Sequence, residues 1–109
     1  NKDVPFKCGE CDDAVIVEDC PSACAVSNIL TGIAIMGTKL KDLHKSHLKP
    51  YKKLYVCLDR DATTKAYDIA KDLRSSGFDN VVVKPLEDDL KYFNTEQIRE
   101  MFYDRKTNA

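Results

Sequence analysis

The chain has 109 residues, of which 43% are hydrophobic and 32% are charged, which suits one domain with a single core. Its 17 Lys and Arg nearly balance 18 Asp and Glu, which excludes a uniformly basic nucleic-acid coat protein and a disordered acidic tail. The longest apolar run is too short to cross a bilayer, and no secretory signal precedes it. We therefore expect a cytoplasmic protein and, because the first residue is Asn1, a piece of a longer one.

Four short runs rich in β-branched residues alternate with four helical patterns along the chain. Strands that read as continuous apolar runs between helices are typical of a parallel sheet covered on both faces. The sequence predicts a compact α/β domain at 14–103, between an N-terminal extension at 1–13 and a C-terminal tail at 104–109. The expected strands, about four and mainly parallel, span 14–18, 32–36, 53–58 and 80–83, and the expected helices span 21–30, 40–48, 62–75 and 95–103.

Acidic side chains follow three of these strands. Glu18 ends the first strand, Asp59 and Asp61 follow the third, and Asp88 and Asp89 follow the fourth. Ligands of open parallel sheets bind beyond the carboxyl ends of the strands. If the first and third strands are neighbours, their carboxylates share one crevice, where a hard divalent cation such as Mg²⁺ relieves the repulsion between them. The alternative is that each acid is a solvated turn residue or a helix cap.

The five cysteines suggest no definite metal site. Cys57 lies in an apolar run and is expected to be buried. Cys8 and Cys11 have the spacing of a zinc knuckle, and Cys20 and Cys24 would complete a set of four ligands. We assign no zinc site, because Cys24 packs more naturally into the core from its helix. Packed or free thiols are favoured, and a half-site completed from outside the chain is the alternative.

One segment, 39–53, is basic, with six Lys and two His against one acid. We expect it to form a solvated helix face with both histidines on the surface; contact with phosphates is the alternative. Lys39 at its start, together with Arg60 and Lys65 beside the Asp pair, are the candidates to contact nucleotide or nucleic-acid phosphates.

Two motifs, in their order and separation, resemble the TOPRIM domain shared by topoisomerases, bacterial-type primases and some nucleases. The segment 15–19 (VIVED) is similar to the first family motif, a hydrophobic strand ending in Glu. The segment 58–62 (LDRDA) is similar to the second, an Asp-x-Asp after a strand. The resemblance covers about 14–102, which is most of the chain.

Two further segments favour the primase branch of that family, and within it the phage primases and primase–helicases. The segment 36–40 (MGTKL) is similar to a Gly-Thr turn of primases, and 86–92 (LEDDLKY) resembles a late acidic motif, usually Lys-Asp-Pro. Here Asp88 stands where Lys is common and Leu90 where Pro is common, so we prefer Asp89 as the acidic contributor. Thr64 stands where a Gly often follows the Asp-x-Asp.

The resemblance implies a Rossmann-like TOPRIM fold and a function as the catalytic domain of a DNA primase. Such a domain carries out Mg²⁺-dependent (or Mn²⁺-dependent) nucleotidyl transfer for RNA primer synthesis in DNA replication. Glu18, Asp59 and Asp61 would be catalytic and, together with Asp89, would hold the metal. Because primases carry a template-binding subdomain and a zinc domain upstream, we expect the isolated domain to show little activity.

The implied partners are a single-stranded DNA template, nucleoside triphosphates and either a replicative helicase or further domains of the same chain, with no membrane. The location would be the cytoplasm, that of the host if the protein is phage-encoded. Two alternatives stay open: a TOPRIM nuclease or RNA-processing phosphodiesterase, and a non-catalytic docking module of the replisome.

Overall fold

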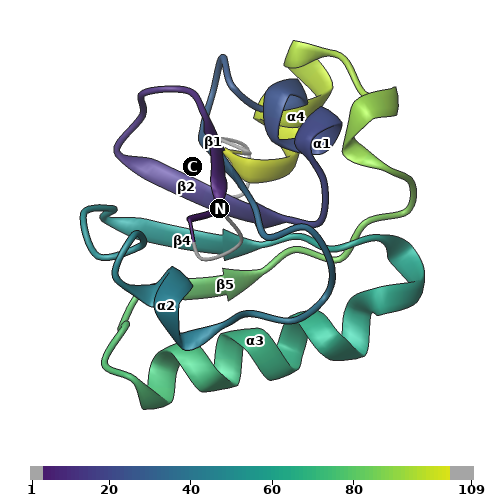
Figure 1. Cartoon of the computed structure of the whole chain (residues 1–109). Helices are drawn as coiled ribbons and strands as arrows, with labels where there is room; N and C mark the ends of the chain where they lie inside the picture. The colour runs from purple at the N-terminus through teal and green to yellow at the C-terminus, as the bar shows by residue number, and fades with distance from the viewer. Residues whose placement is uncertain (1–3, 104–109) are drawn as a thin grey trace.

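Five strands form one mixed sheet with helices packed on it (Figure 1). This computed structural model describes residues 4–103. The sheet order is β1-β3-β2-β4-β5, in which β1 runs antiparallel to β3 and all other pairs are parallel. The predicted compact, mainly parallel α/β architecture is confirmed. The strands are β1 (Phe6–Cys8), β2 (Asp13–Val17), β3 (Thr31–Ala34), β4 (Lys53–Val56) and β5 (Val81–Val83).

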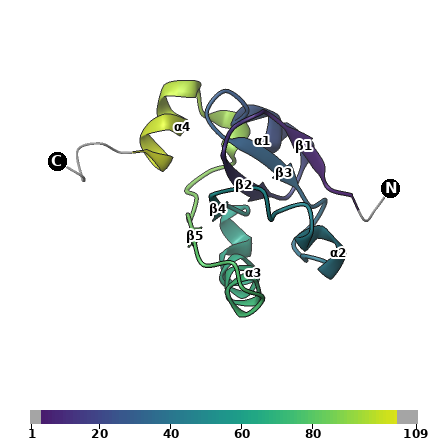
Figure 2. The same cartoon turned by 90° about the vertical axis from the view of Figure 1, so that its left-hand side faces the viewer.

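The helices lie on opposite sides of this sheet, with α3 on one side and α1 and α4 on the other (Figures 1 and 2). Within the described residues, no helix has the length and apolar character needed to cross a membrane. The α-helices are α1 (Cys20–Ala25), α2 (Asp42–Lys45), α3 (Thr63–Ser75) and α4 (Thr95–Phe102), and two 3₁₀ turns are η1 (Arg60–Ala62) and η2 (Leu90–Tyr92).

The side chains of the central strand β2 point alternately to the two faces of the sheet, and they contribute to a hydrophobic core on each face. Ile16 packs with the buried face of α3, whereas Val15 and Val17 pack with α1 and α4 on the opposite face. This arrangement follows from the period of two in an extended chain. All four residues from Ala14 to Val17 have no exposed surface, as expected for a strand covered on both faces.

The edge strand β1 is absent from the sequence-based prediction, which expects about four strands and an extension at 1–13. Phe6 pairs with Ala34, and Cys8 pairs with Gly32 on β3. A three-residue strand with mostly exposed side chains has no periodicity that distinguishes it from an irregular segment. Residues 1–3 and the tail expected at 104–109 lie outside the described residues.

Helix α1 is shorter than the predicted span of 21–30. Asp19 caps its N-terminus, because the Asp19 carboxylate accepts a hydrogen bond of 2.9 Å from the Ser22 backbone N–H. The helix ends at Ala25, since the chain must turn before β3. The expectation that Cys24 packs into the core is wrong, because its side chain is exposed.

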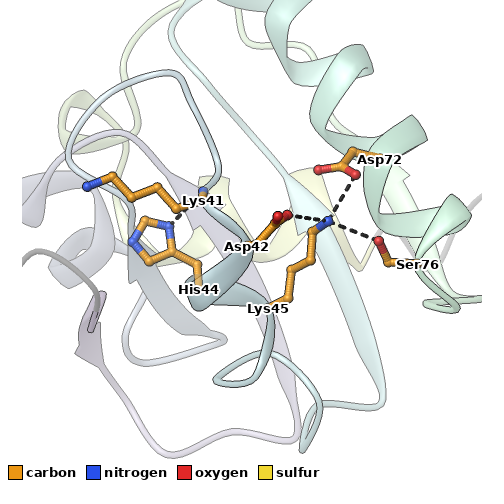
Figure 3. Close-up of polar contacts among 6 residues, drawn as sticks. All are labelled: Lys41, Asp42, His44, Lys45, Asp72 and Ser76. Carbon is orange, nitrogen blue, oxygen red and sulfur yellow. Dashed lines mark hydrogen bonds and ion pairs between the residues drawn. The ribbon is translucent and has the colours of Figure 1, made fainter.

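Helix α2 has four residues, in place of the predicted span of 40–48. Its His44 is 2% exposed, so the expected surface position of this histidine is wrong. The His44 Nδ1 accepts a hydrogen bond of 3.2 Å from the backbone N–H of Lys41 (Figure 3). His47 is exposed, as predicted. The basic segment is therefore mostly turn rather than one continuous helical face.

A cluster of ion pairs around Lys45 links α2 to the C-terminal half of α3 (Figure 3). The Lys45 ammonium lies 2.9 Å from the Asp72 carboxylate and 3.1 Å from the Asp42 carboxylate, and it donates to the Ser76 hydroxyl at 2.9 Å. Hydrogen bonds to Asp72 and Asp42 raise the pKa of Lys45. One of the six lysines of the basic segment is therefore already neutralised within the fold.

Helix α4 closes the second face of the sheet. Asn94 caps it: Asn94 and Gln97 form a reciprocal capping box, with hydrogen bonds of 2.8 and 2.9 Å. Just past the helix, the Tyr103 hydroxyl donates a hydrogen bond of 2.8 Å to the Asp13 carboxylate. This bond joins the end of the described chain to the start of β2.

Tyr103→Phe is expected to lower the free energy of unfolding by about 1 kcal/mol, because it removes that hydrogen bond and leaves the Asp13 carboxylate with one partner fewer. Urea denaturation of both proteins measures the difference. Tyr67→Phe is the matched control, since Tyr67 is 52% exposed. Equal losses in the two variants would contradict a specific role for the Tyr103–Asp13 bond.

Candidate active site

The two strands that carry the principal acidic motifs are direct neighbours. β2 pairs with β4 in parallel register, with Ile16 opposite Val56. The ladder continues past β4, because the Cys57 N–H donates to the Ile16 carbonyl at 2.9 Å. Glu18 and Asp59 therefore leave the same edge of the sheet side by side. The predicted shared crevice is conditional on the first and third predicted strands being neighbours, and that condition is met.

Glu18 is half-buried at the end of β2. Burial, a hydrogen bond with the neighbouring Asp59 carboxylate and the charge of that carboxylate together raise the pKa of Glu18 to about 7, with a smaller contribution from Asp61. A carboxyl group with a pKa near neutrality exchanges protons readily under physiological conditions. Glu18 therefore has the proton affinity of a general acid or base.

A 3₁₀ turn brings the remaining acids together. Asp59 precedes η1, whose first hydrogen bond runs from the Ala62 N–H to the Asp59 carbonyl at 2.8 Å. This turn places Asp61 on the wall of a pocket of about 330 Å³ that Asp88 and Asp89 also line. Two chain segments thus line this acidic pocket, and Glu18, which interacts with Asp59, does not line it.

Asp89 and Asp88 have different surroundings in that pocket. Burial and the charge of Asp59 raise the pKa of Asp89, and the Lys91 ammonium, 3.7 Å away, opposes the shift. The Asp88 carboxylate instead accepts a 2.9 Å hydrogen bond from the backbone N–H of Asp89. Asp89 therefore faces Asp59, whereas Asp88 is engaged with its own turn, in keeping with the preference for Asp89.

The candidate phosphate-binding residues fall into two places. Lys39 and Lys65 line one groove of about 480 Å³ between the β3–α2 segment and α3. The Lys65 ammonium donates a 3.2 Å hydrogen bond to the Thr38 hydroxyl. Arg60 lies on the acidic pocket instead, where its guanidinium donates to the Glu87 carbonyl at 3.5 Å.

Sequence reasoning named the turn at 36–38 but assigned no role to its residues. Met36 adopts the left-handed conformation at φ 59°, which is uncommon for a residue other than glycine. The following Gly37 N–H donates a 3.2 Å hydrogen bond to the Glu18 carbonyl. The turn is therefore anchored on the backbone of Glu18, and it carries Thr38 toward Lys65. In the sequence, the pair of Gly37 and Thr38 is the feature that could have indicated a role for this turn.

The acidic residues offer the oxygen donors that a hard cation prefers, but they do not form a complete set of ligands. Among residues 4–103, no three His, Cys, Asp or Glu side chains converge closely enough to hold a metal ion by themselves. The contacts are pairwise, Glu18 with Asp59 and Asp59 with Asp89. Mg²⁺ is commonly bound by one or two carboxylates, with waters and substrate phosphates as the other ligands. The arrangement suits such a site.

No protein-family model, curated protein or solved structure matches this chain. The resemblance to TOPRIM domains therefore depends on the motif residues themselves and on where the fold places them.

Proposed function

We propose that the chain is the catalytic TOPRIM domain of a DNA primase, which uses Mg²⁺ or Mn²⁺ for nucleotidyl transfer in RNA primer synthesis. The observation that carries the proposal is the apposition of Glu18 and Asp59 at the ends of two neighbouring parallel strands. The proposed substrates are a single-stranded DNA template and nucleoside triphosphates. A replicative helicase or further domains of the same chain are the proposed partners, and the cytoplasm is the proposed location.

The acidic residues would divide the work of metal binding and proton transfer. Asp59, Asp61 and Asp89 would hold Mg²⁺, which when bound supplies charge neutralisation and orientation to the phosphate oxygens. Glu18, whose pKa is about 7, would accept the proton of the attacking hydroxyl. At neutral pH a substantial fraction of such a group is ionised, as a general base requires.

The groove beside the turn gives the triphosphate a place to bind. Lys39 and Lys65 supply positive charge there, and the Thr38 hydroxyl supplies a donor. The turn that carries Thr38 is hydrogen-bonded to Glu18, so phosphate binding and the acidic cluster are coupled through a short rigid connection. Asp68 and Asp72 also line the groove; Asp72 is paired with Lys45, and Asp68 would repel the phosphates.

A calorimetric titration with Mg²⁺, alone and with a nucleoside triphosphate, tests the metal site. We expect binding only at millimolar Mg²⁺ without nucleotide, and binding at least about tenfold tighter with it, because phosphate oxygens complete the coordination. Asp59→Asn/Asp61→Asn is expected to remove that gain. The matched control is Asp79→Asn, an exposed acid in the turn before β5. An unchanged titration in the double variant would reject the site.

The reaction is tested separately by the product formed on single-stranded DNA with all four nucleoside triphosphates. Incorporation of labelled nucleotide into short RNA supports primase chemistry. Cleavage of the DNA strand or of a structured RNA without nucleotide incorporation would replace the proposal by a nuclease. Because primases use a template-binding region, this assay uses the chain joined to one.

A further inference from the structure

Three cysteines lie on the edge strand β1 and on α1, away from the acidic pocket. Cys8 ends β1 and is half-buried, Cys20 begins α1 and is half-buried, and Cys24 lies one turn further along the helix and is exposed. Cys8 and Cys20 both pack against the core that α1 shares with β2 and β3. This group of thiols has no part in the proposed metal chemistry.

The backbone packing holds β1 and α1 in close contact. Gly32 on β3 pairs with Cys8, and it lies directly under Ala23 of α1, since a Cβ added to Gly32 would be 2.2 Å from the Ala23 carbonyl oxygen. The residue after Cys8 is also close to the segment that follows α1: a Cβ added to Gly9 would be 2.9 Å from the Leu30 carbonyl oxygen. Cys24 follows Ala23, so its backbone lies close to β1.

Cys8 and Cys24 come from two elements that are in contact, β1 and α1. The hydrogen bond with the Cys8 thiol is the main cause that raises the pKa of the Cys24 thiol. Cys20 makes the smallest contribution to the raised pKa of Cys24, and its thiol lies 3.7 Å from the Met36 sulfur. Cys57 is 2% exposed and follows β4. Of these cysteines, Cys8 and Cys24 are therefore the two best placed to form a disulfide.

We propose that Cys8 and Cys24 form a reversible intramolecular disulfide that fastens β1 to α1 when the protein meets an oxidant of the glutathione disulfide class. The exposed Cys24 thiolate attacks one sulfur of glutathione disulfide, forms a mixed disulfide and releases one glutathione thiolate. The Cys8 thiolate then attacks the Cys24 sulfur and releases the second glutathione. The protein loses two thiol protons and two electrons, and one glutathione disulfide becomes two glutathione molecules.

The disulfide would stabilise the domain by closing the loop between residues 8 and 24. Restricting the unfolded chain in a loop of this length is expected to raise the Tm by on the order of 10 °C. The increase disappears when the bond is reduced. β1 is the edge strand and has only three residues. A covalent link from β1 to α1 therefore leaves the central strands of the sheet undisturbed.

The experiment equilibrates the whole chain with glutathione disulfide, then quenches free thiols and maps the peptides by mass spectrometry without reduction. We expect three of the five thiols to remain free and a linked peptide pair that contains Cys8 and Cys24. Cys8→Ser and Cys24→Ser are expected to abolish both the link and the Tm increase. Cys11→Ser is the matched control and is expected to keep both.

Three outcomes would overturn the proposal. These are a stable glutathione adduct at Cys24 with Cys8 still free, a link that involves Cys20 or Cys11, and a disulfide between two copies of the chain, which gel filtration under non-reducing conditions would detect. Should Cys8→Ser fail to fold, Cys24→Ser alone decides the result, because an exposed thiol tolerates this change. None of these readouts depends on metal or nucleotide, so the result is independent of the proposed function.

Discussion

Gly32→Ala is expected to lower the free energy of unfolding by more than about 4 kcal/mol, which is comparable with the whole stability of many small domains. The added Cβ would lie 2.2 Å from the Ala23 carbonyl oxygen and 2.5 Å from the Ala23 Cα. Both atoms are backbone, and Gly32 is in a buried strand between β1 and β2. The helix α1 would have to move off the sheet, which exposes the core beneath it. Thermal or urea unfolding followed by circular dichroism measures the loss.

The control for Gly32→Ala is Gly77→Ala, just after α3. Nothing lies within 4 Å of a Cβ at Gly77, although its φ of +99° disfavours a side chain, so we expect a loss of only about 1 kcal/mol. A second change, Ala23→Gly, is not expected to rescue Gly32→Ala, because the clash is with backbone atoms. Rescue by Ala23→Gly, or a small effect of Gly32→Ala alone, would show that α1 sits further from β3.

Glu18→Gln is expected to reduce nucleotidyl transfer by about 10²-fold to 10⁴-fold, the usual contribution of a general acid or base, and yet to stabilise the metal-free protein above neutral pH. Folding raises the pKa of Glu18 from 4.5 to about 7, so the unfolded state loses this proton at lower pH than the folded state. Stability therefore falls as the pH rises from about 4.5 to about 7 and stays lower above that range. Because Glu18→Gln has no carboxyl group to ionise at this position, its stability does not fall for this reason over the same pH range.

The stability difference between Glu18→Gln and the original chain is measured by urea denaturation at pH 4.5 and pH 8, with chelator present. We expect no difference at the lower pH and a gain of about 1 kcal/mol at the higher pH, a modest figure because solvent screens a half-buried group. Glu100→Gln, an exposed acid on α4, is expected to change neither stability nor transfer. A free energy of unfolding that is lower at both pH values in Glu18→Gln would show that Glu18 is structural.

The parallel core and the placement of the acidic motifs were predictable from sequence because each depends on a local pattern. The apolar run before Glu18 and the run before Asp59 are fully buried strands, and buried parallel strands read as continuous apolar segments. Chain order and the position of acids at strand ends then suffice to place the carboxylates on one edge. The long helix α3 was likewise predictable, since Ala66, Ile69 and Leu73 repeat at helical spacing.

Features that depend on distant contacts were not predictable in the same way. The strand β1 exists because β3 offers it a pairing edge, which its own three residues do not reveal. Apolar residues continue past Ala25 at helical spacing, but α1 ends there because the next segment must reach the start of β3. In the basic segment, the burial of His44 depends on the fold around it rather than on its neighbours in sequence.

The order of the chain has a consequence for synthesis on the ribosome. Tyr55 lies in β4, and its ring packs edge-on against the ring of Phe102, with centroids 4.9 Å apart, while its hydroxyl donates to the Phe102 carbonyl. Until the segment with Phe102 emerges, the sheet can pair its strands but leaves the aromatic part of one face uncovered. A nascent chain stalled before α4 would therefore display an apolar surface of the kind that chaperones recognise and that promotes aggregation.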